Sequence, residues 1–96
     1  MVFFTLIESS DETVQILIEA CHHYLTDHDG VVYYSAGPRG EEFTRPVNNQ
    51  TYDVGLHVVF QDKAAHDVYQ THPRHLAFIE ANNETWKNVE IFDSYV

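Results

Sequence analysis

Hydrophobic residues along the chain follow two periods, one typical of strands and one typical of helices. Residues 2–8 and 31–36 are rich in β-branched and aromatic side chains, and residues 52–60 and 89–95 alternate between two faces. These four segments predict strands. In the third segment the larger apolar side chains share one face, and they are Tyr52, Val54, Leu56, Val58 and Phe60.

Helical spacing fills the gap between the first two strands. Ser9 and Glu12 have the spacing of a capping box, and Gly30 gives a stop signal. Between these signals lies an apolar stripe that consists of Val14, Leu17, Ile18, Cys21 and Leu25. Cys21 is the only cysteine, which excludes an internal disulfide, and its place in the stripe predicts an inert core thiol.

A second helical region is interrupted by a proline. Asp62 predicts the N-cap of a helix that runs through Tyr69, with Ala65 and Val68 on the same face. Pro73 disfavours helical geometry at the residue before it and suits the first position of a new helix. The sequence therefore predicts a break and then a second, short helix. Its expected apolar residues are Leu76, Phe78 and Ile79.

The elements occur in the order β-α-β-β-α-β, with one long loop at residues 39–50. This order predicts that residues 1–96 form one α+β domain of the ferredoxin-like type. Such a domain has a four-stranded antiparallel sheet with the helices on one face. The other face, which carries His57 and Val59, is left for a second sheet to cover.

The charge of the chain excludes several classes of partner. Fifteen acidic residues stand against five basic ones, and the formal charge is −10. Such a surface repels phosphate groups, so we expect neither nucleic acid nor a membrane surface as partner. A basic and apolar leader and a long apolar span are both lacking, which favours the cytoplasm. A domain of this size buries little surface, which favours association with a second copy.

The turn at Pro73 allows Tyr69 and His75 to converge, because it brings together residues that a straight helix would hold apart. The start of a helix disfavours an imidazolium, so His75 would be neutral near pH 7 and able to act as a general base. Tyr69 could donate a hydrogen bond to a substrate carbonyl and stabilise an enolate. The two groups could then catalyse a cyclisation or isomerisation without a cofactor. In the structural alternative, His75 bonds a backbone carbonyl and Tyr69 packs with its hydroxyl bonded.

The histidines do not predict a metal site. His72 and His75 lack the i, i+4 spacing of a zinc helix, and no third ligand is near them in the sequence. His72 precedes a proline and is expected to be exposed or bonded to backbone. Four other histidines are predicted to lie at the surface, and they are His22, His23, His28 and His66.

Three stretches carry a resemblance to a known family, and they are residues 52–60, 69–78 and 86–93. They resemble the stress-responsive A/B barrel domain, also called the dimeric α+β barrel. Residues 3–6 and 36–37 also fit, so the likeness covers nearly the whole chain. Its most specific part is the Tyr-x-x-His-Pro-x-His element from Tyr69 to His75. The resemblance implies a homodimer in which the sheets of two copies face each other and close a barrel.

Within that family, the plant polyketide cyclase that closes olivetolic acid uses a tyrosine and the last histidine of this element. By position these residues are Tyr69 and His75, so the resemblance implies them as catalytic residues between the sheet and its helices. A small apolar or aromatic ligand would lie there. The other expected lining residues are Leu56, Val58, Trp86, Ile91 and Asp93. Asp93 either orients His75 or is solvated, and Trp86 either walls the pocket or only anchors the last strand.

The sequence departs from the family pattern at two positions. Members usually carry a histidine shortly before the position of Phe3, and the cyclase carries one where this chain has Val54. His57 cannot replace the latter, because it points to the opposite face of a regular strand. Two alternatives to a catalytic pocket remain. One is a non-catalytic, stress-related dimer, and the other is a cofactor-free monooxygenase or haem-degrading barrel, since those share the fold.

Overall fold

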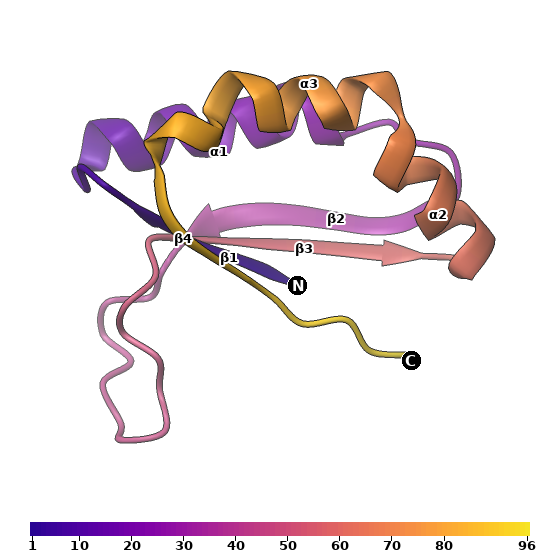
Figure 1. The fold of residues 1–96 in the computed structure, drawn as a ribbon. Coiled ribbons are helices and arrows are strands. Elements are labelled where there is room, and N and C mark those ends of the chain that lie inside the picture. The colour runs from indigo at the N-terminus through magenta and orange to yellow at the C-terminus, as the bar shows by residue number, and fades with distance from the viewer.

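The structure, a computed structural model, describes residues 1–96 and has two layers, a four-stranded sheet and the helices that cover one of its faces (Figure 1). The elements are β1 Val2–Leu6, α1 Asp11–Leu25, β2 Val31–Pro38, β3 Val54–Phe60, α2 Lys63–Thr71, α3 Pro73–Asn82, the 3₁₀ turn η1 Asn83–Thr85 and β4 Trp86–Ile91. The strand order is β2-β3-β1-β4, and every neighbouring pair is antiparallel. The ferredoxin-like prediction is confirmed.

The core lies between the sheet and the helices. Its ten buried residues are Phe4, Leu6, Leu17, Ile18, Cys21, Leu25, Val54, Leu56, Tyr69 and Phe78. The predicted stripe of α1 supplies four of them, because residues three and four apart lie on one helical face. Cys21 is a free, fully buried thiol, and burial raises its pKa to about 12. The predicted place of this thiol in the core is confirmed, and its inertness stays a prediction.

The capping box of α1 lies one residue later than the sequence predicted. Ser10 is the N-cap, since its hydroxyl oxygen accepts from the Thr13 backbone N–H at 3.1 Å. Thr13 Oγ1 accepts in return from the Ser10 backbone N–H at 2.8 Å. Ser9 donates instead to Asp53 Oδ1, so the Ser9–Glu12 assignment was wrong. Threonine fills the place that glutamate or glutamine takes in the usual motif.

Each of the four strands differs from the sequence prediction at one end or both. β1 ends at Leu6 instead of residue 8, and β4 begins at Trp86 instead of residue 89. β2 continues through Gly37 and Pro38, because it is an edge strand and a proline there removes no ladder hydrogen bond. β3 begins only at Val54, and Tyr52 packs on the outer face of the sheet against Phe3, with ring centroids 4.8 Å apart. Tyr52 therefore does not share the inner face. β4 ends at Ile91, so the alternation up to residue 95 lies partly outside the strand.

The buried face of α2 is not the one predicted. Asp62 caps this helix as expected, its carboxylate accepting from the Ala65 backbone N–H at 2.9 Å. Val68, however, is 62% exposed. His66 is half-buried instead, with its ring centroid 5.3 Å from that of Phe60. Positions 66 and 69 face the sheet together because they lie three residues apart, and position 68 falls outside that stripe.

The break between α2 and α3 occurs at His72, which has extended backbone at φ −64° and ψ 136°. Its Nδ1 accepts from the Arg74 backbone N–H at 3.1 Å and so caps α3, in agreement with the expected backbone role. The Arg74 guanidinium donates to the carbonyl oxygens of His23 at 2.8 Å and Thr26 at 2.9 Å. These carbonyls belong to the last turn of α1 and its cap, so Arg74 ties the start of α3 to the end of α1.

His28 is buried, with 8% of its surface exposed, although the sequence predicted a surface position. The chain reverses after α1 through Asp27 and Gly30, which have positive φ angles of 60° and 82°. This reversal folds His28 against Tyr69 and His72, with ring centroids 4.9 and 4.7 Å apart. Its Nε2 lies 2.8 Å from the Tyr24 carbonyl oxygen. The histidines of the last turn of α1, at positions 22 and 23, are exposed as predicted.

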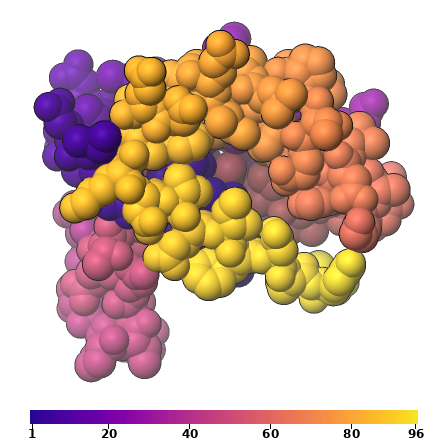
Figure 2. Space-filling view, viewed as in Figure 1, coloured from indigo at the N-terminus to yellow at the C-terminus, as the bar shows by residue number.

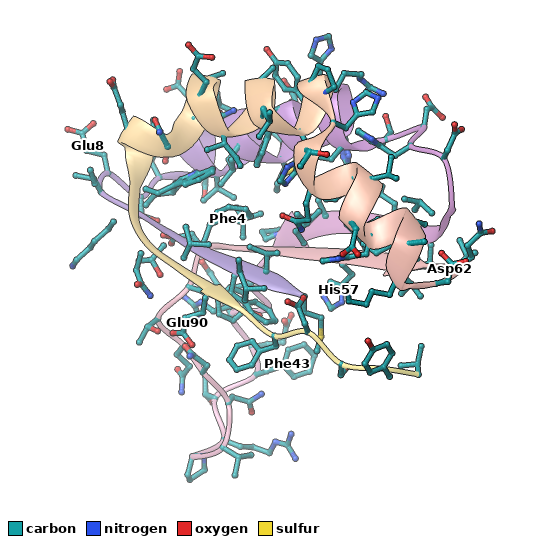
Figure 3. The ribbon with its side chains drawn as sticks, turned by 45° about the vertical axis from the view of Figure 1, so that its right-hand side comes forward. Phe4, Glu8, Phe43, His57, Asp62 and Glu90 are labelled. Carbon is teal, nitrogen blue, oxygen red and sulfur yellow. The ribbon has the colours of Figure 1, made fainter.

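The face of the sheet opposite the helices carries an aromatic group. Phe3 lies at its centre, with ring centroids 4.8 Å from Tyr52, 5.9 Å from Phe92 and 6.3 Å from His57. In Figure 3, His57 lies on this side and Phe4 lies on the helix side. The loop between β2 and β3 extends away from the body on this side, whereas the segment after β4 runs alongside the body toward the α2 end (Figures 1 and 2). None of the helices has the length and apolar character needed to cross a bilayer.

Candidate functional site

A hollow of about 180 Å³ lies between the sheet and the α2–α3 region. Thirteen of its seventeen lining residues are hydrophobic, so its walls are mostly apolar. The residues that the sequence selected all line it, and they are Leu56, Val58, Tyr69, His75, Trp86, Ile91 and Asp93. They come from four separate elements, β3, α2, α3 and β4, and from the segment after β4, which the fold brings to one place.

Tyr69 and His75 stand side by side at this hollow. Their ring centroids are 4.4 Å apart and their planes meet at 44°. The convergence depends on the extended backbone at His72, which ends α2 before α3 begins. Tyr69 is only 5% exposed, and burial raises the pKa of its phenol well above the ordinary value. The phenol therefore keeps its proton near neutral pH. No hydrogen bond contributes to the shift in the pKa of Tyr69, so its proton is available for donation to a ligand.

His75 has a defined tautomer. Its Nδ1 lies 3.1 Å from the Gln70 carbonyl oxygen. A carbonyl oxygen only accepts, so Nδ1 carries the hydrogen and Nε2 keeps its lone pair. Burial is the main cause that lowers the pKa of this imidazole, and nearby His28 and His66 act in the same direction, while the Gln70 carbonyl opposes them.

The sequence attributed the neutrality of His75 to the start of α3, and the structure adds burial as a cause that lowers the pKa of its imidazole. A neutral imidazole with a lone pair at Nε2 has the form that a general base requires. The expected structural role of His75, a bond to a backbone carbonyl, is also present. This bond is compatible with a role as general base, because it places the proton of the neutral imidazole on Nδ1 and leaves Nε2 unprotonated.

Asp93 does not orient His75. It is exposed beyond the end of β4, and no hydrogen bond joins the two residues. The Gln70 carbonyl holds the imidazole in its place. Asp93 lies among the residues that line the hollow and is the only carboxylate there.

The part of the hollow nearest α3 is aromatic. The Trp86 ring lies 4.9 Å from Phe4 and 5.7 Å from Phe78, measured between centroids. The indole Nε1 is buried and has no hydrogen-bond partner. Trp86 begins β4 and packs on the core as expected, and it also forms part of the wall, so its two expected roles coincide.

Sequence reasoning missed two polar residues of the wall, His66 and Gln70. Gln70 Nε2 lies 3.2 Å from His66 Nε2, and His66 Nδ1 lies 3.2 Å from Asp67 Oδ1. A signal was present, because positions 66 and 70 are one helical turn apart and flank Tyr69. This spacing was not recognised, because the sequence prediction placed Val68 on the buried face of the helix.

The structure contains no group of three or more His, Cys, Asp or Glu side chains placed to hold a metal ion. His57, the histidine of β3, lies on the outer face of the sheet (Figure 3) and does not reach the hollow. His57 pairs with Ser35 of β2, and strict alternation along β3 places its side chain on the face opposite to that of Leu56 and Val58.

Known proteins resemble this chain along its full length. The family model of the Stress responsive A/B Barrel Domain matches residues 1–96. A Dabb family protein with a ferredoxin-like fold from Mesorhizobium loti has a TM-score of 0.74 and 23% identity, over 93% of this chain and 85% of that chain. No curated protein matches the chain.

Two further solved structures are described as dimeric ferredoxin-like proteins of unknown function. The one from Jannaschia sp. CCS1 has a TM-score of 0.76 and 21% identity, over 99% of this chain and 94% of that chain. The one from Thermobifida fusca has a TM-score of 0.74 and 16% identity, over 93% of this chain and 80% of that chain. At these identities the likeness establishes the fold.

Proposed function

Because its residues 1–96 match the family model, the chain belongs to the stress-responsive A/B barrel domain family, and we propose that it is a homodimer that holds a small apolar or aromatic molecule in each subunit. Support for the ligand comes from the apolar walls of the hollow and from the two polar groups at one side, Tyr69 and His75. Few, well-placed polar groups in an apolar concavity are typical of small-molecule sites.

The proposed chemistry is proton abstraction beside a carbonyl, followed by ring closure or isomerisation. Nε2 of His75 takes the proton from carbon, and the Tyr69 hydroxyl donates a hydrogen bond to the carbonyl oxygen as enolate charge develops. The resulting imidazolium returns the proton at the end of the reaction, so no cofactor is consumed. This proposal rests on the contact of His75 Nδ1 with the Gln70 carbonyl oxygen. That contact leaves the Nε2 lone pair of His75 available, in a ring that lies beside the protonated phenol of Tyr69.

Exchange of carbon-bound hydrogen tests this chemistry directly. Acetophenone is apolar and aromatic, and its methyl protons exchange slowly in D₂O, so NMR would follow any acceleration by the protein. We expect His75→Gln to slow the catalysed exchange by about 10²- to 10⁴-fold. Tyr69→Phe should slow it by about 10²-fold, since one donor to the oxyanion is lost.

The matched control for this experiment is His22→Gln, which removes an exposed imidazole outside the hollow. It should exchange acetophenone at the wild-type rate. Exchange no faster than buffer in the wild type, or equal rates in all variants, would remove proton abstraction from consideration. Shifts of the acetophenone resonances on binding would still report on occupancy of the hollow.

The proposed dimer forms through the outer face of the sheet. Its support is the aromatic group around Phe3, which no segment of the same chain covers with a second layer, together with the dimeric relatives. Sedimentation should find a mass of two chains, and Phe3→Asp should shift it toward one chain, because a charge would then lie in an apolar interface. A wild-type mass of one chain across the micromolar range would end this part of the proposal.

A second candidate is a stress-related dimer without catalytic activity. The size of the hollow favours it, since about 180 Å³ is below the volume of typical small-molecule sites, about 300–1,000 Å³. The same size disfavours a ligand as large as haem. This candidate predicts that acetophenone neither exchanges nor binds, while the dimer persists in both Tyr69→Phe and His75→Gln.

A further inference from the structure

His28 is a buried, titratable side chain that takes no part in the proposed chemistry. The residue is 8% exposed, and it does not line the hollow at which Tyr69 and His75 lie. It belongs to the segment that connects α1 to β2 and passes beside α2 (Figure 1). An apolar side chain would fill this place without giving up hydration, so the burial of an imidazole here needs a specific reason.

One role of His28 is structural and belongs to its Nε2. This atom lies 2.8 Å from the Tyr24 carbonyl oxygen. Because a carbonyl oxygen only accepts, Nε2 carries a hydrogen and donates it. The Tyr24 carbonyl belongs to the last turn of α1, where backbone acceptors lack partners within the helix. The carbonyl oxygen of the preceding residue, His23, accepts from Arg74. His28 therefore helps to cap the end of α1.

The ring of His28 also has contacts that capping does not require. Its centroid lies 4.9 Å from that of Tyr69 and 4.7 Å from that of His72, and both pairs have the edge-to-face geometry that aromatic rings prefer. The His72 ring is itself fixed, since its Nδ1 accepts from the Arg74 backbone N–H. The His28 ring thus has a hydrogen bond to α1 and a contact with the cap of α3, which together fix its position beside Tyr69.

The orientation of the Tyr69 phenol depends on the rings around it. Three rings contact it, and they are those of His28 at 4.9 Å, Phe60 at 5.0 Å and His75 at 4.4 Å, measured between centroids. Phe60 and His75 line the hollow together with Tyr69, whereas His28 does not. In a close-packed interior, removal of one neighbour lets a ring change its direction. His28 is therefore the contact of Tyr69 that lies outside the ligand space.

We propose that His28 is a positioning residue of the candidate site, because its ring keeps the phenol of Tyr69 beside the imidazole of His75. The kinetic consequence rests on the proposed function, whereas the geometric consequence can be measured without any reaction. A misplacement of about 1 Å can slow a catalysed step by about 10²-fold. His28 contacts neither the ligand space nor the reacting atoms, so it acts only through Tyr69.

Two substitutions separate the ring of His28 from its nitrogen. His28→Gln keeps an N–H that can donate to the Tyr24 carbonyl oxygen, but it removes the ring. His28→Phe keeps a ring against Tyr69 and removes the donor. We expect the chemistry to follow the ring. His28→Phe should lower the urea unfolding midpoint, since a carbonyl oxygen of α1 loses its donor, and should still keep most of the activity.

Exchange of the acetophenone methyl protons in D₂O gives the kinetic readout. At saturating acetophenone, His28→Gln should slow the exchange by about 10- to 100-fold. Its dissociation constant for acetophenone should change less than about twofold, because His28 does not line the hollow. His28→Phe should stay within about threefold of the wild type in both quantities. His23→Gln is the control, since it removes an exposed imidazole from the last turn of α1 and should match the wild type.

Nuclear Overhauser effects between ring protons give the geometric readout. The wild type should show effects between His28 and Tyr69 and between Tyr69 and His75, whose rings are in contact. In His28→Gln the effect between Tyr69 and His75 should weaken, because the phenol is no longer fixed. It should persist in His28→Phe and in His23→Gln.

Four results would overturn the inference. They are the absence of either ring effect in the wild type, an unchanged Tyr69–His75 effect in His28→Gln, equal loss of rate in His28→Gln and His28→Phe, and a loss in His28→Gln that lies in the dissociation constant alone. A wild type that does not accelerate exchange would end the proposed chemistry, and the ring effects would then decide on positioning by themselves. Should His28→Gln fail to fold, loss of the Tyr69–His75 effect in His28→Phe would overturn the inference and its persistence would support it.

Discussion

The two faces of the sheet are built from the same strands, yet they differ in what covers them. Phe4 points to the helices, is 2% exposed and contacts Phe78 and Trp86. Its neighbour Phe3 points the other way and contacts Tyr52 and Phe92, which belong to segments at the margins of the sheet. Alternation along a strand supplies both faces at once, but only the helix layer completes one of them. An apolar outer face is therefore a feature that needs a partner, which supports the proposed dimer.

The largest expected effect is a truncation on the inner face. Phe4→Ala should lower the free energy of unfolding by about 3–5 kcal/mol, because it removes a ring that is 2% exposed and enlarges the space between sheet and helices. Urea unfolding followed by fluorescence of Trp86 measures this loss.

Phe3→Ala is the matched change on the outer face and sharpens the comparison. Its cost should depend on protein concentration, because the outer face is buried only when a second copy covers it. A cost for Phe3→Ala as large as that for Phe4→Ala, and independent of concentration, would mean that the two faces are equally buried within one chain.

The next effect concerns the layer that closes the inner face. Arg74→Met should cost about 1.5–3 kcal/mol, since two charge-assisted bonds to the His23 and Thr26 carbonyl oxygens are lost. Arg45→Met is the control, because Arg45 bonds only to Asn48 in an exposed loop, and it should cost less than about 0.5 kcal/mol. Equal unfolding midpoints for the two variants in urea would contradict the role given to Arg74.

A smaller effect is expected where the helix layer begins. Ser10→Ala should cost about 1 kcal/mol, as the loss of an N-cap usually does. Glu12→Gln should cost less than half of that, because Glu12 takes no part in the capping box. Thermal unfolding of both variants distinguishes the observed capping box from the predicted one. A larger loss of stability in Glu12→Gln than in Ser10→Ala would favour the predicted box.

The smallest effect is a pH dependence from the inner face. The pKa of His75 is lowered in the folded state, so the unfolded chain binds more protons between that lowered pKa and the ordinary value of about 6.5. Stability should therefore rise with pH through this window and fall as the pH drops below about 6.5. Urea midpoints at several pH values measure the slope, and His75→Gln should reduce it. An unchanged slope in that variant would show that other groups cause it.

The sequence predicted the element order, the broken second helix and the α1 stripe, because each has a strong local signal. The spacing of hydrophobic residues and the presence of a proline determine the structure of the few residues around them. It also selected residues that lie around one hollow, although their function remains a prediction. The failures have a different origin. The burial of His28 depends on a reversal through Asp27 and Gly30, and the extension of β2 through Pro38 depends on its place at the sheet edge. Both are set by tertiary neighbours.

The choice of face in α2 shows the same limit on a smaller scale. Val68 is the more hydrophobic residue, yet His66 faces Phe60 because the position of Tyr69 fixes the helix rotation. A helix of nine residues with a single buried side chain gives too weak a period for sequence reasoning to choose between neighbouring stripes.

The hydrogen bonds of the Arg74 guanidinium also bear on which helix can move when a ligand enters the hollow. It joins α3 to α1, whereas Tyr69 is the only buried residue of α2, so we expect α2 to move more readily than α3, about the break at His72. Entry of a ligand into the 180 Å³ hollow would then depend on movement of α2, while α1 and α3 stay in place. Amide hydrogens of α2 should accordingly exchange with solvent faster than those of α3. Slow exchange in both helices would show that ligand entry does not depend on movement of α2.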